Sequence, residues 1–256
     1  MEKTYRLIFL LLSFFSCANV CSQQKPLPME QPELRNKKEL VICHAGYSLS
    51  YNKNTNCPDW VAWELTEDKA YAVTTKRTND FRGDPDIPPL NRVEGYDYKE
   101  SGYDRGHMCP AGDMKWSAAA MSESFYMSNI CPQTTELNQK WWEHLEKACR
   151  RWTSQEGKIY VCCGPIFNNK IPPKYIGNEV KVRVPNGFFK VVLSLNKGQE
   201  KAIGFIYKNN YERQTMESTA TTVDEVENIT GFYFFPQLDK KLEDRIEGTF
   251  NLRRWN

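Results

Sequence analysis

The chain has 256 residues, of which 40% are hydrophobic and 13% aromatic, so it can bury the core of one good-sized domain and is not wholly disordered. Its 34 basic and 32 acidic residues leave a formal net charge of +2, which excludes a chain drawn to polyanions by overall charge. Any binding of nucleic acid must therefore depend on a local basic surface or on a metal.

The first residues have the pattern of an export signal. Two basic residues flank the start of an almost unbroken apolar run from Leu7 to Phe15, which is far shorter than the ~20 residues of a membrane-spanning helix. We expect residues 1–22 to be a signal peptide and the mature protein to be exported: secreted, periplasmic or lipid-anchored at the cell envelope. The end of the signal stays open, because a small residue before Cys17 is typical of lipoproteins, whereas cleavage near Ser22 is the alternative.

The segment after the signal contains three prolines within a short polar stretch. This composition predicts a tether or disordered lead-in over residues 23–38. One domain is expected to follow it, over residues 39–256.

The body of the chain alternates short strand patterns with a few helix patterns and has no βαβ rhythm, which predicts an α+β domain. Strands are predicted at 40–43, 60–65, 125–128, 159–163, 188–195 and 202–207. Helices are predicted from Ser117, over 135–151, and from Thr222 to a stop at Gly231, where Thr222 and Glu225 form a capping box. Residues 80–98, rich in Pro, Gly, Asp and Arg, predict a surface loop beside a site.

Seven cysteines lie beyond the signal, an odd number, so at least one is free or pairs outside the chain. Cys43 and Cys57 are candidates for a disulfide that staples a hairpin. The adjacent Cys162 and Cys163 would point to opposite faces of a strand and so would not pair with each other. The chain has no Cys-x-x-Cys pair, which argues against a structural zinc site.

The first candidate site residue is His107, one of three histidines, in the box Asp104-Arg105-Gly106-His107. An acid, a guanidinium and an imidazole are packed around a glycine there, a cluster that is costly to bury as plain core. A salt-bridged turn with a partly exposed histidine would be the simpler explanation for an isolated histidine. The pattern downstream favours a catalytic role instead.

That downstream pattern is Ser128-Asn129-Ile130-Cys131-Pro132-Gln133, followed by Leu137-Asn138-Gln139-x-x-Trp142-x-x-Leu145-Glu146. On a helix, Asn138, Trp142 and Glu146 recur at i, i+4 and i+8, so the amide and the carboxylate face broadly the same side. Their oxygens are hard ligands of the kind that Mg²⁺ accepts. Taken singly, each has a simpler explanation: a solvated helix start for Asn138, and a surface acid for Glu146.

With these three motifs in order, the chain resembles the DNA/RNA non-specific endonucleases, a family that includes secreted bacterial nucleases and mitochondrial endonuclease G. Looser similarity covers nearly all of the mature chain. The resemblance implies a ββα-metal (His-Me finger) fold, with a central, mostly antiparallel sheet flanked by helices. In this fold a hairpin that carries the histidine packs on the helix that carries a metal-binding asparagine.

Carried over residue by residue, the resemblance implies that His107 is the general base and Asn138 the direct ligand of Mg²⁺, with Mn²⁺ as a substitute. It implies that Glu146 holds the waters on the metal, that Asn129 orients the site and that Arg105 lies near the scissile phosphate. The family also uses an arginine upstream of the histidine box.

That upstream role could fall to Arg77 or Arg82, and Arg77 is preferred. The function expected from the resemblance is a metal-dependent endonuclease that cuts DNA and RNA without sequence specificity and leaves 5′-phosphate ends. A homodimer is common in the family, but no motif of this chain demands one. A metal-dependent phosphodiesterase for small diesters, or a catalytically silent nucleic-acid-binding module, remain the alternatives.

Overall fold

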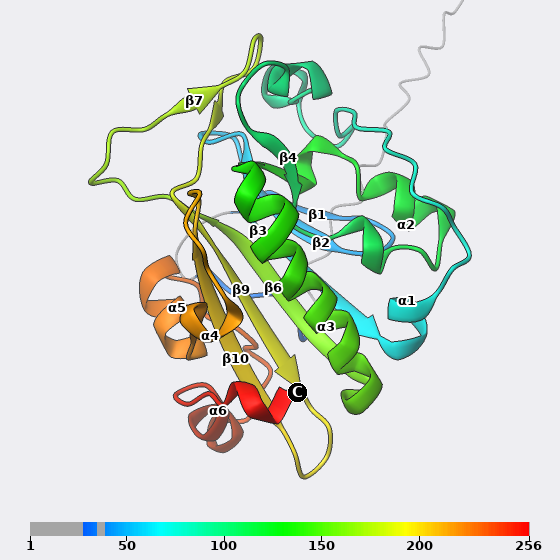
Figure 1. The fold of residues 1–256 in the computed structure, drawn as a ribbon, viewed down its shortest axis with the longest axis vertical. Coiled ribbons are helices and arrows are strands. Elements are labelled where there is room, and N and C mark those ends of the chain that lie inside the picture. Colours follow the sequence, from blue (N-terminus) through cyan, green and yellow to red (C-terminus); the bar gives the residue numbers. More distant parts are fainter. Residues whose placement is uncertain (1–27, 35–38, 256) are drawn as a thin grey trace, which may run out of the picture.

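A seven-stranded sheet runs through the middle of the computed structural model, which describes residues 28–34 and 39–255 (Figure 1). All neighbouring strands in it pair antiparallel. In sheet order the strands are β1 (Val41–Cys43), β2 (Ser48–Asn52), β3 (Cys57–Thr66), β6 (Lys158–Ile166), β9 (Gly187–Ser194), β10 (Lys201–Lys208) and β11 (Ala220–Thr221).

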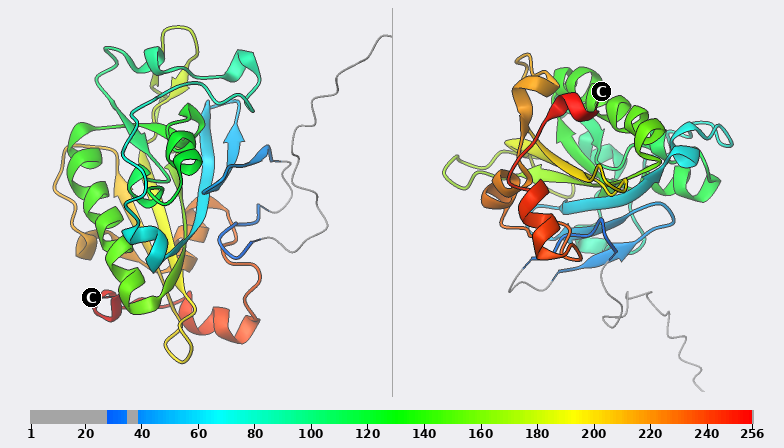
Figure 2. Two further views of the ribbon diagram at one scale, coloured as in Figure 1. Left: turned by 90° about the vertical axis from the view of Figure 1, so that its right-hand side faces the viewer. Right: turned by 90° about the horizontal axis from the view of Figure 1, so that it is seen from below.

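Helices cover both faces of this sheet (Figure 2). Apolar side chains of α3 pack with one cluster of buried residues, and those of α5 and α6 pack with a second cluster. The α-helices are α1 (Glu67–Tyr71), α2 (Ala118–Glu123), α3 (Glu143–Glu156), α4 (Met216–Thr219), α5 (Val223–Thr230) and α6 (Lys240–Ile246). Within the described ranges, no helix is both long and apolar enough to cross a bilayer.

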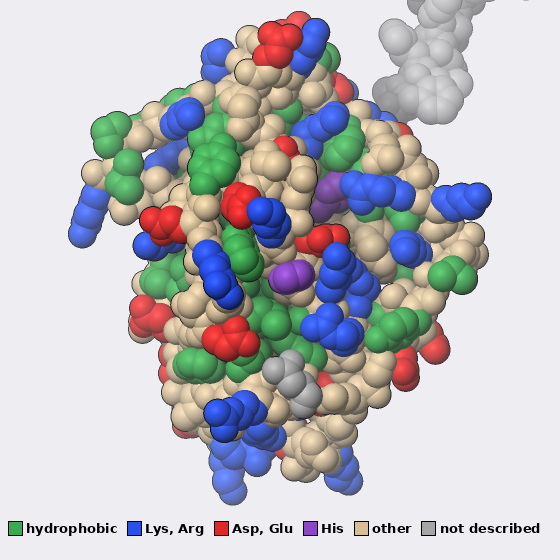
Figure 3. All heavy atoms as spheres, viewed as in Figure 1, with side chains coloured by type: hydrophobic (Ala, Val, Ile, Leu, Met, Phe, Trp, Pro, Cys, Tyr) green, Lys and Arg blue, Asp and Glu red, His purple; other side chains and the backbone are tan. Residues whose placement is uncertain are grey.

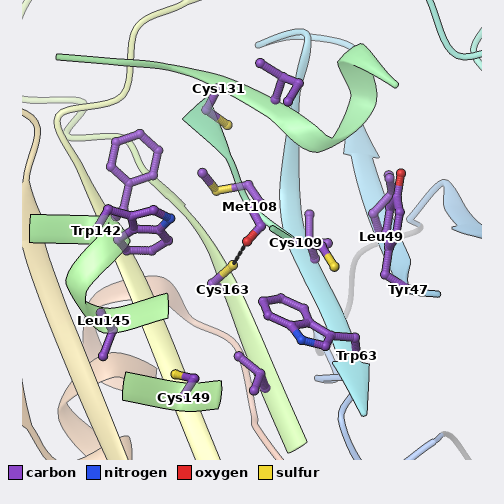
Figure 4. Packing of buried hydrophobic residues seen from close by; sticks show 14 of the residues in the cluster. Tyr47, Leu49, Trp63, Met108, Cys109, Cys131, Trp142, Leu145, Cys149 and Cys163 are labelled. Atoms are coloured by element: carbon purple, nitrogen blue, oxygen red, sulfur yellow. Dashed lines mark hydrogen bonds between the residues drawn. The ribbon is translucent and has the colours of Figure 1, made fainter. Parts of the chain in front are cut away.

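The two-residue period of the central strands separates the two cores. Trp63 and Cys163 lie in the cluster under α3, whereas Trp60 and Cys162 lie in the cluster under α5 and α6. The prediction that the two adjacent cysteines face opposite sides is thus confirmed. Figure 4 shows the first cluster, where the Sγ of Cys163 lies 3.4 Å from the backbone oxygen of Met108.

A small two-stranded sheet carries the histidine box. β4 (Asp104–His107) pairs antiparallel with β5 (Ile130–Gln133). The indole Nε1 of Trp142 donates to the backbone oxygen of His107 at 3.2 Å and joins this pair to the helix that follows. The α+β class and the ββα arrangement expected from the resemblance are therefore confirmed.

The capping residues predicted from the sequence are found at the helix ends. Ser117 and Thr222 are the N-caps of α2 and α5, each accepting a hydrogen bond from a backbone N–H three residues on. Gly231 closes α5 in the left-handed region with φ of 76°, a conformation that glycine adopts without strain.

Two predicted elements differ from the structure. Residues 125–128 form no strand: a 3₁₀ turn, η4 (Met127–Asn129), leads into β5, and the apolar side chains there are buried by turns. The helix predicted over 135–151 continues to Glu156, and its beginning, η5 (Leu137–Trp142), is π-helical. Burial alone does not distinguish a strand from a turn packed into the core.

The predicted tether and disulfide also need correction. In the described part of the tether, Glu33 forms a β-bridge with Tyr233, so residues 28–34 lie against the domain. Apolar Met29 and Leu34 explain this contact, because they pack on the cluster under α5 and α6. Cys57 is a buried free thiol and no staple to Cys43 forms. The predicted signal peptide, residues 1–22, lies outside the described residues.

Gly106 supports the pairing of β4 with β5, since a Cβ there would lie 2.0 Å from Oε1 and 2.3 Å from Cδ of the fully buried Gln133. We expect Gly106→Ala to destabilise the protein by ~1–3 kcal/mol through overpacking. Urea denaturation measures this loss. In a Gln133→Ala background the same change should cost much less, and an equal cost in both backgrounds would show that the contact is not the cause.

Candidate active site

A cavity of about 480 Å³ opens where β4 meets the helix formed by η5 and α3. Five predicted site residues line it: Arg77, Arg105, His107, Asn138 and Glu146. Figure 3 shows Lys and Arg side chains gathered beside acidic and histidine side chains on the face that carries α3. A protein with a net charge of only +2 thus gathers basic side chains locally beside this cavity.

His107 lies at the wall of this cavity and is only 8% exposed. Its ring packs against Phe81 and Phe125, with centroids 5.4 Å and 5.0 Å away. Among the described residues, none forms a hydrogen bond with its Nε2. Burial, together with the positive charges of Arg77 and Arg105, lowers the pKa of His107 to about 3. The imidazole is therefore neutral, the form that accepts a proton.

Asn138 lies in η5, and its Nδ2 donates to Oδ2 of Asp104 at 2.9 Å. Because the nitrogen is engaged in this bond, the amide oxygen is the end available to a cation. The neighbouring Gln139 donates to the same carboxylate oxygen, also at 2.9 Å. Asp104, the first residue of the histidine box, thus fixes the orientation of the Asn138 amide. The amide oxygen is a hard ligand of the kind that Mg²⁺ accepts.

Glu146 lies on α3, one turn beyond the end of η5, and lines the same cavity. Burial raises its pKa to about 7, although Lys190 and Arg150 oppose this shift. A cation in the cavity would favour the charged carboxylate. The oxygens of Asn138 and Glu146 therefore fit a divalent metal, either directly or through water.

The two candidate upstream arginines occupy different places. Arg77 lies over the ring of Phe125 at 4.8 Å and lines the cavity, opposite Arg105, which lies 4.1 Å over Phe81. Arg82 instead donates to Asp80 at 2.8 Å and to the hydroxyl of Ser122 at 2.9 Å, and it does not line the cavity. Its position fits a structural tie between the loop and α2.

Asn129 does not reach the cavity. Its fully buried amide accepts from the backbone N–H of Cys109 at 2.8 Å and donates to the backbone oxygens of Cys109 and Ser124 at 2.8 and 2.9 Å. These bonds hold the chain two residues beyond His107. Such contacts suit a residue that positions the site.

Sequence reasoning missed part of the site. Arg150 lines the cavity and forms a 2.7 Å ion pair with the buried Asp113. Its spacing of four residues from Glu146 was a usable signal. Lys190 is fully buried in β9 beneath these charges, 4.4 Å over the ring of Trp142, and a lone charge in an apolar strand was the signal there.

Comparison with known proteins defines the class. The family model described as DNA/RNA non-specific endonuclease matches residues 26–241. The chain therefore belongs to this family, as its three motifs suggested. The alignment includes every residue that lines the cavity.

Particular relatives agree with the family. Nuclease EXOG, mitochondrial, of Xenopus laevis is 34% identical over 211 residues, which is 77% of this chain and 58% of that protein. Endonuclease G, mitochondrial, of Homo sapiens is 32% identical over 217 residues, 80% of this chain and 70% of the relative. A chain in the crystal structure of the EndoG/EndoGI complex superposes with a TM-score of 0.74 at 30% identity, covering 80% of this chain and 89% of its own. This chain thus spans less than two thirds of the EXOG relative.

These relatives are named nucleases, so the predicted enzyme class, a hydrolase of nucleic acids, is confirmed at the level of the family. The prediction of an exported, secreted, periplasmic or lipid-anchored protein is wrong, because relatives of this chain are mitochondrial nucleases. A short apolar run after basic residues did not distinguish these destinations. The comparisons support neither the lipid anchor nor the homodimer.

The neutral state of His107 depends first on burial and then on the positive charges of Arg77 and Arg105. Arg77→Ala removes one positive charge, so the pKa of His107 should rise from about 3 toward its usual ~6.5. The acidic limb of the profile of kcat/KM against pH should then move to higher pH, because His107 takes up a proton at higher pH. Arg82→Ala, which removes an arginine outside the cavity, should leave this limb in place; an equal shift in both variants would contradict the assignment.

Proposed function

We propose that this chain is a metal-dependent endonuclease that hydrolyses phosphodiester bonds of DNA and RNA without sequence specificity and leaves 5′-phosphate ends. One observation carries the proposal: a buried, neutral imidazole, whose Nε2 has no hydrogen-bond partner among the described residues, shares a cavity with the oxygens of Asn138 and Glu146 and the guanidinium groups of Arg77 and Arg105. A base, a cation site and anion-binding side chains are the parts that phosphodiester hydrolysis requires. Membership of the nuclease family supports the same reaction.

In this mechanism His107 is the general base. Its Nε2 takes a proton from the attacking water, which then adds to phosphorus in line with the departing 3′ oxygen. The rings of Phe81 and Phe125 keep the imidazole in place through 5.4 Å and 5.0 Å contacts. Neutrality at all pH values above about 3 keeps the base ready without prior loss of a proton.

The cavity arginines bind the phosphate. Arg77 and Arg105 lie on aromatic rings that limit their motion, so their guanidinium groups offer fixed donors to the non-bridging oxygens. Both side chains are exposed enough to meet a polymer. Charge that builds up on the phosphate during attack is stabilised by these two groups.

Asn138 and Glu146 would hold the metal, Asn138 through its amide oxygen and Glu146 through water. Mg²⁺, with Mn²⁺ as a substitute, supplies Lewis-acid polarisation of the phosphate and stabilises the departing 3′ oxygen when bound. Asp104 keeps the amide of Asn138 in the required orientation through its 2.9 Å bond. Asn129 holds the segment beyond His107 and acts as a positioning residue.

The expected lack of sequence preference follows from what the cavity offers. The proposed contacts are made to phosphate, and contacts to phosphate position a nucleic acid without reading its bases. None of the proposed steps uses a 2′-hydroxyl, the group that distinguishes RNA from DNA. Both sugars should therefore be cut.

The decisive test is His107→Ala. We expect this change to lower the cleavage of supercoiled plasmid and of single-stranded RNA by ~10²–10⁴-fold, because the proton acceptor is lost. The matched control is His144→Ala, which removes an exposed histidine of α3 outside the cavity and should leave the rate nearly unchanged. Wild-type activity should disappear with EDTA. Cleavage by His107→Ala at the wild-type rate would refute the assigned base, and binding without cleavage by wild type across Mg²⁺ and Mn²⁺ would favour a binding module.

Asn138→Ala tests the metal assignment separately. Loss of the amide oxygen should raise the Mg²⁺ concentration required for half-maximal activity and lower the maximal rate. Even the loss of a residue that only holds a metal ligand typically costs about 10–100-fold in metal affinity or activity. A Mg²⁺ titration of the initial rate measures both effects. Gln139→Ala, which removes the neighbouring amide on the same Asp104, is the control; an unchanged Mg²⁺ requirement in Asn138→Ala would exclude this ligand.

A further inference from the structure

α5 and α6 lie across the sheet from α3 (Figure 2). Three carboxylates meet at the corner where α5 and the end of α6 come together. They belong to Asp224, Glu227 and Glu247, and their ligand oxygens all lie within 4.8 Å of one another. We propose that these side chains bind a hard divalent cation, with the size and chemistry of Ca²⁺, that stabilises this corner. The site is separate from the cavity that contains His107.

The backbone brings the three carboxylates together. Asp224 and Glu227 lie three residues apart on α5, so they share one face of the helix. The carbonyl oxygen of Glu247 accepts hydrogen bonds from the backbone N–H groups of Val223 and Asp224, at 3.1 and 3.3 Å. The residue that ends α6 is thereby fixed to the first turn of α5, with its side chain beside the other two acids.

An unpartnered buried oxygen is the observation that points to a ligand. Glu247 is only 1% exposed, and no described residue forms a hydrogen bond with its Oε1. A buried carboxylate without a donor or a cation is costly. The nearby Lys240 forms ion pairs with Glu243 and Asp244 at 2.7 and 2.8 Å instead.

The number of carboxylates favours Ca²⁺ over Mg²⁺. Ca²⁺ takes six to eight oxygen ligands at roughly 2.3–2.6 Å in flexible geometry, whereas Mg²⁺ keeps several waters and usually binds through one or two carboxylates. Three protein carboxylates whose ligand oxygens lie within 4.8 Å of one another therefore suit the larger ion.

The elements that carry the three carboxylates suggest what the cation does. Glu247 lies beyond residues 26–241, the part that the family model matches. Val223, Val226 and Ile246 pack in the core on this side of the sheet. A cation shared by Asp224, Glu227 and Glu247 would hold α6 on α5 and cover that core.

The experiment is thermal unfolding of the full chain carrying Asn138→Ala, which removes the proposed catalytic metal ligand from the comparison. With free Ca²⁺ at about 100 times its Kd, we expect the Tm to rise by roughly 5–10 °C over the value in EDTA, with a smaller rise in Mg²⁺. Binding of Tb³⁺, followed by its luminescence, provides a second readout. Neither readout depends on nuclease activity, so failure here and failure of the proposed function are distinguishable.

Matched variants identify the ligands. Asp224→Asn and Glu247→Gln should each abolish the Ca²⁺-dependent rise, whereas Glu225→Gln, at an exposed acid next to Asp224 on α5, should keep it. Asp224 is exposed, so its variant reports on binding even where Glu247→Gln fails to fold. The proposal is overturned where the Tm ignores Ca²⁺, where the Tm rises only on acidification, as a proton on Glu247 would produce, or where Asp224→Asn responds like Glu225→Gln.

Discussion

The arrangement around the cavity depends on keeping one imidazole neutral beside two cations. Burial removes the water that would solvate a charged His107, and Arg77 and Arg105 oppose its protonation further. The Nε2 of this ring has no hydrogen-bond partner among the described residues, so other contacts must support the ring and fix its orientation. Packing against two phenylalanine rings and the bond from Trp142 to its backbone oxygen supply that support. The pairing of β4 with β5 is therefore inseparable from the chemistry.

The helix side of the cavity has the opposite requirement. There the carboxyl of Glu146 must carry a negative charge where little water solvates it. Burial raises the pKa of Glu146 to about 7, and the positive charges of Lys190 and Arg150 oppose this. Lys190 lies between the rings of Trp63 and Trp142, at 5.3 and 4.4 Å, where it supplies charge without occupying the cavity. A divalent cation would shift the same balance further toward the carboxylate. The two walls thus hold a neutral base and a chargeable acid a short distance apart.

The sequence predicted the parts of this arrangement that depend on local chemistry. The caps Ser117, Thr222 and Gly231 specify helix ends through one or two residues, and all three were found. The alternation that sends Cys162 and Cys163 to opposite faces follows from strand geometry alone. Elements whose form depends on distant packing were not predicted. The apolar side chains of residues 125–128 predicted a buried strand, but turns bury these side chains equally well.

The same limit applied to the helix formed by η5 and α3. At about 100° per residue, a regular α-helix places Asn138 and Glu146 roughly 80° apart with Trp142 between them. Trp142 is instead 1% exposed and bonds to the backbone of His107, while the other two line the cavity. The π-helical turn η5 explains this, because one extra residue in a turn takes roughly 100° out of the advance and brings Asn138 nearly into line with Glu146. The π-helical turn thus separates Trp142, which bonds to β4, from the oxygens of Asn138 and Glu146, which line the cavity. A periodicity of 3.6 cannot reveal such a change of phase, and π-turns occur often at functional sites.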